Sequence, residues 1–128
     1  MSYDAYQSYQ STHLNAQTAQ ASPVQLVLVL MDGLLDELAR TRAHIEARRY
    51  EMKARSLEKC VGIINGMSSA LDMDRGGEVV QNLARLYDYC ARRLFTSGIE
   101  MDVGPLDEVT RLMSQIRGGW QGVQARHG

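Results

Sequence analysis

The sequence predicts an all-α protein, an antiparallel up-down-up-down four-helix bundle with a flexible N-terminal arm. Apolar residues recur at helical spacing in four stretches, and no stretch shows the alternation of a strand. Aromatic residues make up only 6% of the 128 residues while Met reaches seven, which is typical of a helical-bundle core. The two prolines, Pro23 and Pro105, stand where helices can begin. One domain of this length can bury a core of its own.

The first segment, residues 1–21, is rich in Gln, Ser, Thr and Ala and poor in large aliphatic residues, so it cannot order itself by burial. Tyr3, Tyr6 and Tyr9 would nevertheless share roughly one face of a short helix. Two interpretations remain open, a frayed tail with incidental tyrosines or an arm that docks its rings into a groove. The regular spacing favours the arm. We therefore divide the chain into an arm, residues 1–21, and a bundle domain, residues 22–128.

The first helix begins cleanly, because Ser22 is a good N-cap and Pro23 fits the first helical position. Its first turns are apolar on almost every side. The run of 12 residues from Val24 to Leu35 is too short for a membrane span, which needs about 20 residues. A secretory signal is also excluded, since the first 20 residues carry no Lys or Arg. One side of this helix faces the bundle, and the other needs the arm, a second protomer or a partner as cover. The predicted inward stripe is Val24, Val27, Leu28, Met31, Leu34, Leu35, Leu38 and Ile45.

Three further helices follow from the same periodicity. The second runs from Tyr50 to about Leu71, and a turn at Gly76 and Gly77, both able to adopt positive φ, leads into the third. The last connection is expected in "SGIEMDVGP", and the glycine-rich end "RGGWQGVQARHG" is expected to fray. The predicted inward residues of the second helix are Tyr50, Leu57, Cys60, Val61, Ile64, Met67 and Leu71. Those of the third helix are Val79, Val80, Leu83, Leu86, Tyr87, Cys90 and Leu94. Those of the fourth helix are Leu106, Val109, Leu112, Met113, Ile116, Trp120 and Val123.

Residues with catalytic or ligand-binding chemistry are scattered in the sequence. The three histidines lack carboxylates at metal-ligand spacing, and Cys60 and Cys90 lack CxxC spacing, so buried free thiols are favoured over a disulfide. A formal net charge of −1 gives no reason to expect nucleic acid or an anionic membrane as partner. We expect no enzyme activity, no catalytic residue, no metal site and no cofactor, and no insertion into a membrane.

Several motifs occur in series along nearly the whole chain: "SYQST", "ASPVQLVLVLMDG", "SSALDMDRGGEVVQNLARLYDYCARRL" and "IRGGW". In this order they closely resemble the FliS-type flagellar secretion chaperones. The one visible departure is Met31, where the family usually has an aromatic residue in LYDG. Because Met31 lies on the inward stripe, a flexible apolar side chain should fill similar space. The departure therefore leaves the expected fold unchanged.

The resemblance implies a cytosolic four-helix bundle that binds the disordered C-terminal region of flagellin. It implies that binding prevents premature polymerisation and assists delivery to the flagellar type III export apparatus. Such a client would dock its apolar residues as helices in grooves. The alternative is a non-catalytic structural or regulatory bundle that self-associates through the first helix, and a homodimer stays open. The candidate client-binding residues lie off the inward stripes: Leu26, Val29, Leu30, Gly33, Ile63 and Tyr89.

Overall fold

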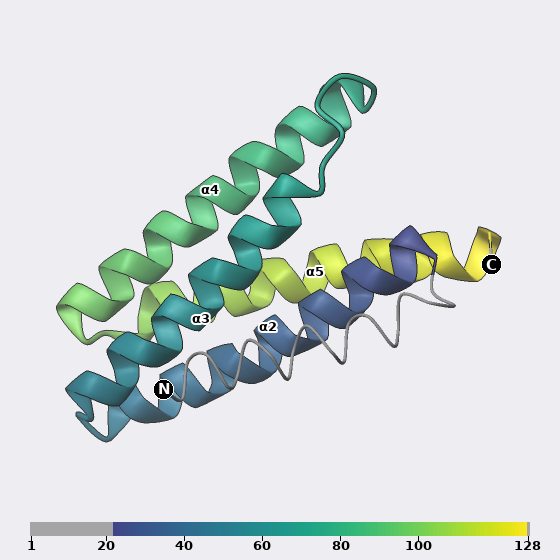
Figure 1. The fold of residues 1–128 in the computed structure, drawn as a ribbon. Coiled ribbons are helices and arrows are strands. Elements are labelled where there is room, and N and C mark those ends of the chain that lie inside the picture. The colour runs from purple at the N-terminus through teal and green to yellow at the C-terminus, as the bar shows by residue number, and fades with distance from the viewer. Residues whose placement is uncertain (1–21, 128) are drawn as a thin grey trace.

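The computed structural model describes residues 22–127, and this part of the chain forms four helices without strands (Figure 1). They are α2 (Pro23–Glu46), α3 (Tyr50–Ser69), α4 (Gly77–Glu100) and α5 (Val103–His127). Helix α2 packs against α3 and α5, and α4 packs against the same two helices, so the four form a closed ring. Consecutive helices run in opposite directions (Figure 1). The predicted antiparallel bundle is confirmed.

The helices form two pairs that diverge. Figure 1 shows α3 and α4 leaving α2 and α5 at an angle, so that the α3–α4 turn lies well away from the start of α2 and the end of α5. At the opposite end of the bundle, the α2–α3 turn and the α4–α5 turn lie close together. Surfaces between the pairs are therefore more open toward the α3–α4 turn.

Helix α2 starts after Ser22, as predicted, and a capping box with Gln25 fixes this start. The Ser22 hydroxyl accepts a hydrogen bond from the Gln25 backbone N–H at 3.1 Å, and the Gln25 side chain accepts one from the Ser22 N–H at 2.9 Å. Pro23 occupies the first turn, where its missing N–H has no intrahelical partner to lose. The helix ends at Glu46, and Arg48, at a φ of 59°, turns the chain into α3.

The turn between α3 and α4 uses its two glycines differently from the prediction. Gly77 has a φ of +61°, but Gly76 lies in the right-handed helical region at −79°. Gly76 is needed for space instead, because a Cβ atom there would overlap the Val80 side chain. Asp72 is a turn residue, since its carboxylate accepts from the Arg75 N–H at 3.2 Å.

The connection between α4 and α5 is much shorter than predicted. Helix α4 continues to Glu100, and only Met101 and Asp102 separate it from α5. Met101 adopts the left-handed conformation at a φ of 52° that ends many helices. The Asp102 side chain then accepts from the Gly104 N–H at 2.9 Å, which caps the first turn of α5.

The core follows most of the predicted stripes, but two residues predicted as inward are well exposed at helix ends. Tyr50, the first residue of α3, is 58% exposed, and Val79, in the first turn of α4, is 69% exposed. Both lie next to turns, where the neighbouring helices no longer cover them, so their prediction as inward residues is wrong. The fully buried apolar residues are Met31, Leu34, Leu38, Cys60, Cys90, Leu94, Leu106, Val109 and Met113, closely joined by Ile45, Ile64, Met67 and Tyr87.

The predicted fraying of the C-terminal end is also wrong, because α5 extends to His127. Trp120 packs against the core from this last part of the helix. The Ser22 hydroxyl lies 3.4 Å from the Gln124 side-chain oxygen, so the end of α5 stays beside the start of α2. Packing thus compensates for the weak helix propensity of Gly118, Gly119 and Gly122.

Candidate functional site

Four of the predicted site residues lie on one face, between α2 and α3. Leu26, Leu30 and Gly33 are on the same stripe of α2 as Glu37, which is bonded to Ser56 of α3. Ile63 lies seven residues beyond Ser56, just as Leu30 lies seven before Glu37, so the antiparallel register places Ile63 opposite Leu30. Leu30 and Ile63 both pack against the core and remain partly exposed. We call this surface the α2–α3 face.

The other predicted residues lie elsewhere. Val29 is roughly 100° around α2 from Leu30, on the side turned away from the core, and is partly exposed. Tyr89 is on the opposite part of the bundle, where its hydroxyl donates to Glu108 Oε2 of α5 at 2.7 Å. That hydrogen bond raises the pKa of Tyr89. Tyr3, Tyr6 and Tyr9 lie outside the described residues. The structure therefore gathers four of the six client-binding candidates and separates Val29 and Tyr89 from them.

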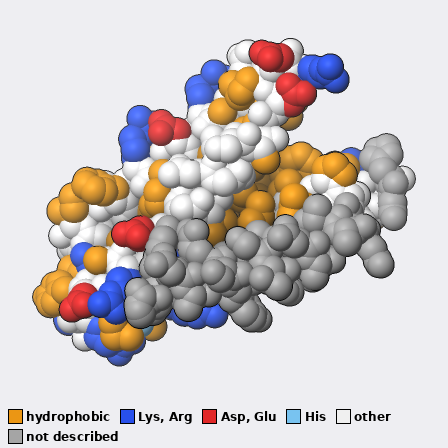
Figure 2. Space-filling model, viewed as in Figure 1, with side chains coloured by type: hydrophobic (Ala, Val, Ile, Leu, Met, Phe, Trp, Pro, Cys, Tyr) orange, Lys and Arg blue, Asp and Glu red, His pale blue; other side chains and the backbone are white. Residues whose placement is uncertain are grey.

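A second surface, a groove between α3 and α4, was not predicted from the sequence. It has a volume of about 560 Å³, and its apolar wall includes Leu57 and Val61 of α3 with Leu94, Phe95 and Ile99 of α4. Phe95 and Ile99 are 68% and 67% exposed although both side chains are wholly apolar. In Figure 2, hydrophobic side chains gather where α4 ends and also in the angle between the α3–α4 pair and α5. One sequence signal was that Phe95 and Ile99, four residues apart, fall off the inward stripe.

One end of this α3–α4 groove is closed by a tight contact between the helices. A Cβ atom at Gly98 would overlap the Leu57 side chain, so glycine allows the two helices to approach here. The Lys53 ammonium donates to the Gly98 carbonyl at 2.9 Å and fixes the same end. Further along α3, Gly62 lines the groove with open space where a side chain would be. The groove is therefore anchored at one end and open along its length.

The α2–α3 face contains a buried polar cluster. The Thr41 hydroxyl donates to the Glu37 backbone carbonyl at 2.9 Å. It also lies 2.6 Å from the Ser56 hydroxyl, a contact in which either hydroxyl can be the donor. Ser56 in turn donates to the Glu37 carboxylate, whose other oxygen accepts from Arg40 at 2.9 Å. Cys60 lies beside Thr41, and burial raises the pKa of its thiol to about 12. The cluster links α2 to α3 by specific contacts within an otherwise apolar seam.

Ion pairs join α5 to both of its neighbours. The Arg117 guanidinium binds the Asp32 carboxylate through two nitrogens at 2.6 and 3.4 Å, and Arg42 binds Asp107 through two at 2.9 and 3.1 Å. Arg93 of α4 donates to Glu108 at 2.7 Å. The hydrogen bonds from Tyr89 and Arg93 lower the pKa of Glu108. These paired arginines fix the register of α2 and α4 against α5.

The described residues offer no grouping suited to metal chemistry. Among residues 22–127, no three His, Cys, Asp or Glu side chains come together in a way that could hold a metal ion. Within the same range, none of the helices combines the length and apolar character of a membrane span.

A model of the family described as "Flagellar protein FliS" matches residues 5–127 of this chain. The chain belongs to the FliS family. Among its relatives is the "Flagellar secretion chaperone FliSB" of Pseudomonas aeruginosa, 39% identical over 93% of this chain and 94% of that protein. The "Flagellar secretion chaperone FliS" of Salmonella typhimurium is 34% identical over 93% of this chain and 89% of that protein.

The fold of this FliS family member is also found in a solved structure. That structure, titled "Crystal structure of flagellar chaperone from bacteria", has a TM-score of 0.78, covers 99% of this chain and 100% of its own, and is 16% identical. The geometry gives a physical role to two stretches that carried the resemblance. Asp32 of "LMDG" and Arg117 of "IRGGW" form the ion pair between α2 and α5. Met31, the departure from the family pattern, is fully buried, as predicted.

Proposed function

We propose that this protein is a cytosolic export chaperone that binds the disordered C-terminal region of flagellin. By holding that region it prevents premature polymerisation and assists delivery to the flagellar type III export apparatus. Membership of the FliS family supports the role of a flagellar secretion chaperone. The observation that supports client binding most directly is the α3–α4 groove, whose rim leaves Phe95 and Ile99 exposed.

An amphipathic client helix fits the shape and chemistry of this groove. Apolar residues at i, i+3 and i+4 of such a helix would enter between Leu57 and Val61 on one wall and Phe95 and Ile99 on the other. Gly62 lines the groove and leaves room for a client side chain there. Burial of apolar surface at about 25 cal/mol per Å² would offset the ordering of a disordered segment.

The α2–α3 face gives the same client a second place to bind. Leu26, Leu30, Gly33 and Ile63 remain its candidate residues, and Val29 and Tyr89 remain candidates that lie apart from this face. The arm of residues 1–21 would cover client surface in the free protein through Tyr3, Tyr6 and Tyr9. Covering an apolar surface in this way limits self-association.

A titration with the C-terminal segment of flagellin tests the proposal. Phe95→Asp should weaken binding at least tenfold, because a charge then stands on the apolar wall of the groove. Val79→Asp is the matched control, since Val79 is equally exposed on the same helix but does not line the groove. An Asp in the first turn of α4 also suits the helix dipole, so the control should stay folded.

Two results would contradict the proposal. Equal affinities for the Phe95 and Val79 variants would remove the groove from client binding. Failure of the unmodified protein to bind flagellin, together with self-association that is lost in Leu26→Asp, would favour the alternative of a structural or regulatory bundle.

A further inference from the structure

The two walls of the α3–α4 groove differ in chemistry. The α4 wall is apolar, and Phe95 stands well exposed on its rim. On the α3 wall, Leu57 and Val61 pack against the core, whereas Glu58 and Gly62 are exposed and line the groove beside them. A helix bound in the groove would therefore meet an apolar rim on one side and a carboxylate on the other.

The Glu58 carboxylate is not engaged by any side chain in the part of the chain that the structure describes: no hydrogen bond or ion pair joins it to another residue there. The cations of α3 around it are directed elsewhere. Lys53 donates to the Gly98 carbonyl at 2.9 Å. Arg55 and Lys59 lie on the side of α3 that faces α2, where Arg55 donates to Glu51 at 2.6 Å. The carboxylate is therefore available to a partner.

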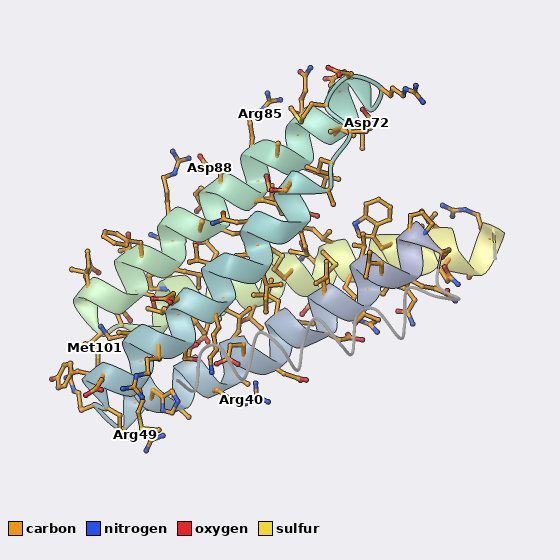
Figure 3. All side chains as sticks on the ribbon, in the orientation of Figure 1. Arg40, Arg49, Asp72, Arg85, Asp88 and Met101 are labelled. Carbon is orange, nitrogen blue, oxygen red and sulfur yellow. The ribbon has the colours of Figure 1, made fainter. Side chains whose placement is uncertain are left out.

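Glu58 is also the one carboxylate among the described residues that line the groove. Asp88, on the neighbouring α4, pairs with Arg92 of its own helix at 3.3 Å and points away from the bundle (Figure 3). The one cation of the lining, Lys53, is bonded at the closed end. The open part of the groove thus presents a single negative charge within an apolar surface.

Glu58 and Phe95 lie on opposite rims at about the same height. Gly98 sets the register, because it packs directly against Leu57. In an antiparallel pair, three residues back from Gly98 correspond to about three residues forward from Leu57, so Phe95 lies level with the turn of α3 that contains Glu58. A ring and a carboxylate placed in this way suit a long cationic side chain, whose apolar stem covers the ring while its charge reaches the carboxylate.

We infer that the α3–α4 groove binds a basic side chain of the client helix, Lys or Arg, between Phe95 and Glu58. This inference rests on the proposed function and specifies a residue that the flagellin segment must carry. Gly62 lies four residues beyond Glu58, about 6 Å along the helix, and leaves open space for a large client residue. The basic residue should therefore stand three or four positions from a large apolar residue of the client. The ion pair sets the register of the client, while the apolar contacts supply the burial.

Two single variants that each remove one negative charge test the inference. Glu58→Gln removes the carboxylate and keeps the size of the side chain. Glu78→Gln is the matched control, because Glu78 is also exposed but lies in the first turn of α4, outside the groove. Both variants change the net charge equally, so general electrostatic attraction is controlled. Circular dichroism confirms that both are folded.

The probe is the C-terminal segment of flagellin, titrated into the full chain at low salt and at about 0.5 M salt, where exposed charges are largely screened. Glu58→Gln should bind the segment about fivefold more weakly than the unmodified protein at low salt, and the difference should shrink at high salt. Glu78→Gln should stay within about twofold of the unmodified protein under both conditions.

Replacing each Lys and Arg of the segment by Gln completes the test. One replacement should weaken binding to the unmodified protein but not to Glu58→Gln, and it should lie three or four positions from a large apolar residue. If the unmodified protein binds the segment, but Glu58→Gln matches Glu78→Gln or no replacement shows this coupling, the basic contact is overturned while the chaperone function stands. If the unmodified protein does not bind the segment, both fall.

Discussion

Replacing Ser56 by alanine removes one hydroxyl from the buried contact between α2 and α3. Ser56 and Glu37 are each 3% exposed, so water cannot replace the lost donor to the Glu37 carboxylate. Hydrogen bonds to charged groups contribute about 1.5–3 kcal/mol, and an unsatisfied buried acceptor carries the full desolvation cost. We expect Ser56→Ala to lower the free energy of unfolding by about 2 kcal/mol. For a protein of this size the melting temperature should fall by roughly 6–10 °C.

Urea unfolding followed by circular dichroism measures this change. Ser69→Ala is the control, because Ser69 is an exposed residue at the end of α3 and its loss should matter by less than about 0.5 kcal/mol. The double variant Glu37→Leu with Ser56→Ala removes both polar groups and should recover much of the lost stability. Arg40 is exposed enough to be hydrated without Glu37. A Ser56→Ala protein as stable as the control, or a double variant less stable than Ser56→Ala, would refute the reasoning.

Three other predictions concern the first helix, the thiols and the arm. Leu34→Asp should unfold the protein, because Leu34 is fully buried. Leu26→Asp should keep the fold and weaken client binding in a pull-down, because Leu26 is partly exposed. Equal loss of structure in the two variants would contradict the assignment of Leu26 to the surface. Burial raises the pKa of Cys60 to about 12 and that of Cys90 to about 11, so thiol reagents should react slowly with the folded protein when no denaturant is present. The free energy of unfolding should fall as the pH rises above 9.0, because the thiols of the unfolded chain ionise at a lower pH than those of the folded protein. Rapid labelling of the folded protein would contradict that burial. Deleting residues 1–15 should strengthen flagellin binding modestly if the arm competes with the client for the surface. Weaker binding after the deletion would mean that the arm clamps the client. Unchanged binding would mean that the arm is a frayed end.

The helices themselves could be predicted from local signals. The 3.6-residue apolar period placed Leu34, Cys90 and Met113 inside, and all three are fully buried. The start of α2 followed from Ser22 and Pro23, whose capping contacts depend on adjacent residues alone. These features can be predicted without knowing which helices pack against each other.

The α2–α3 face and the α3–α4 groove depend on how the helices pack against each other, which the periodicity of apolar residues does not show. Leu57 and Val61 were predicted as inward residues, and they do pack against the core, but they also line the α3–α4 groove because the neighbouring helix leaves them partly open. The burial of Glu37 and Ser56, which are both polar, does not follow from periodicity, because it depends on the antiparallel register of α2 and α3 that brings the two side chains into hydrogen-bonding distance. The short α4–α5 connection depended on Met101 adopting a conformation that glycine usually provides.

Isothermal titration calorimetry with the C-terminal segment of flagellin, repeated at several temperatures, tests the central claim most directly. Coupled folding of a disordered client onto the bundle should bury on the order of 2,000 Å² and give a strongly negative heat-capacity change with saturable binding. A heat-capacity change near zero, or no binding by the unmodified protein, would contradict the claim that these apolar surfaces hold a flagellin client.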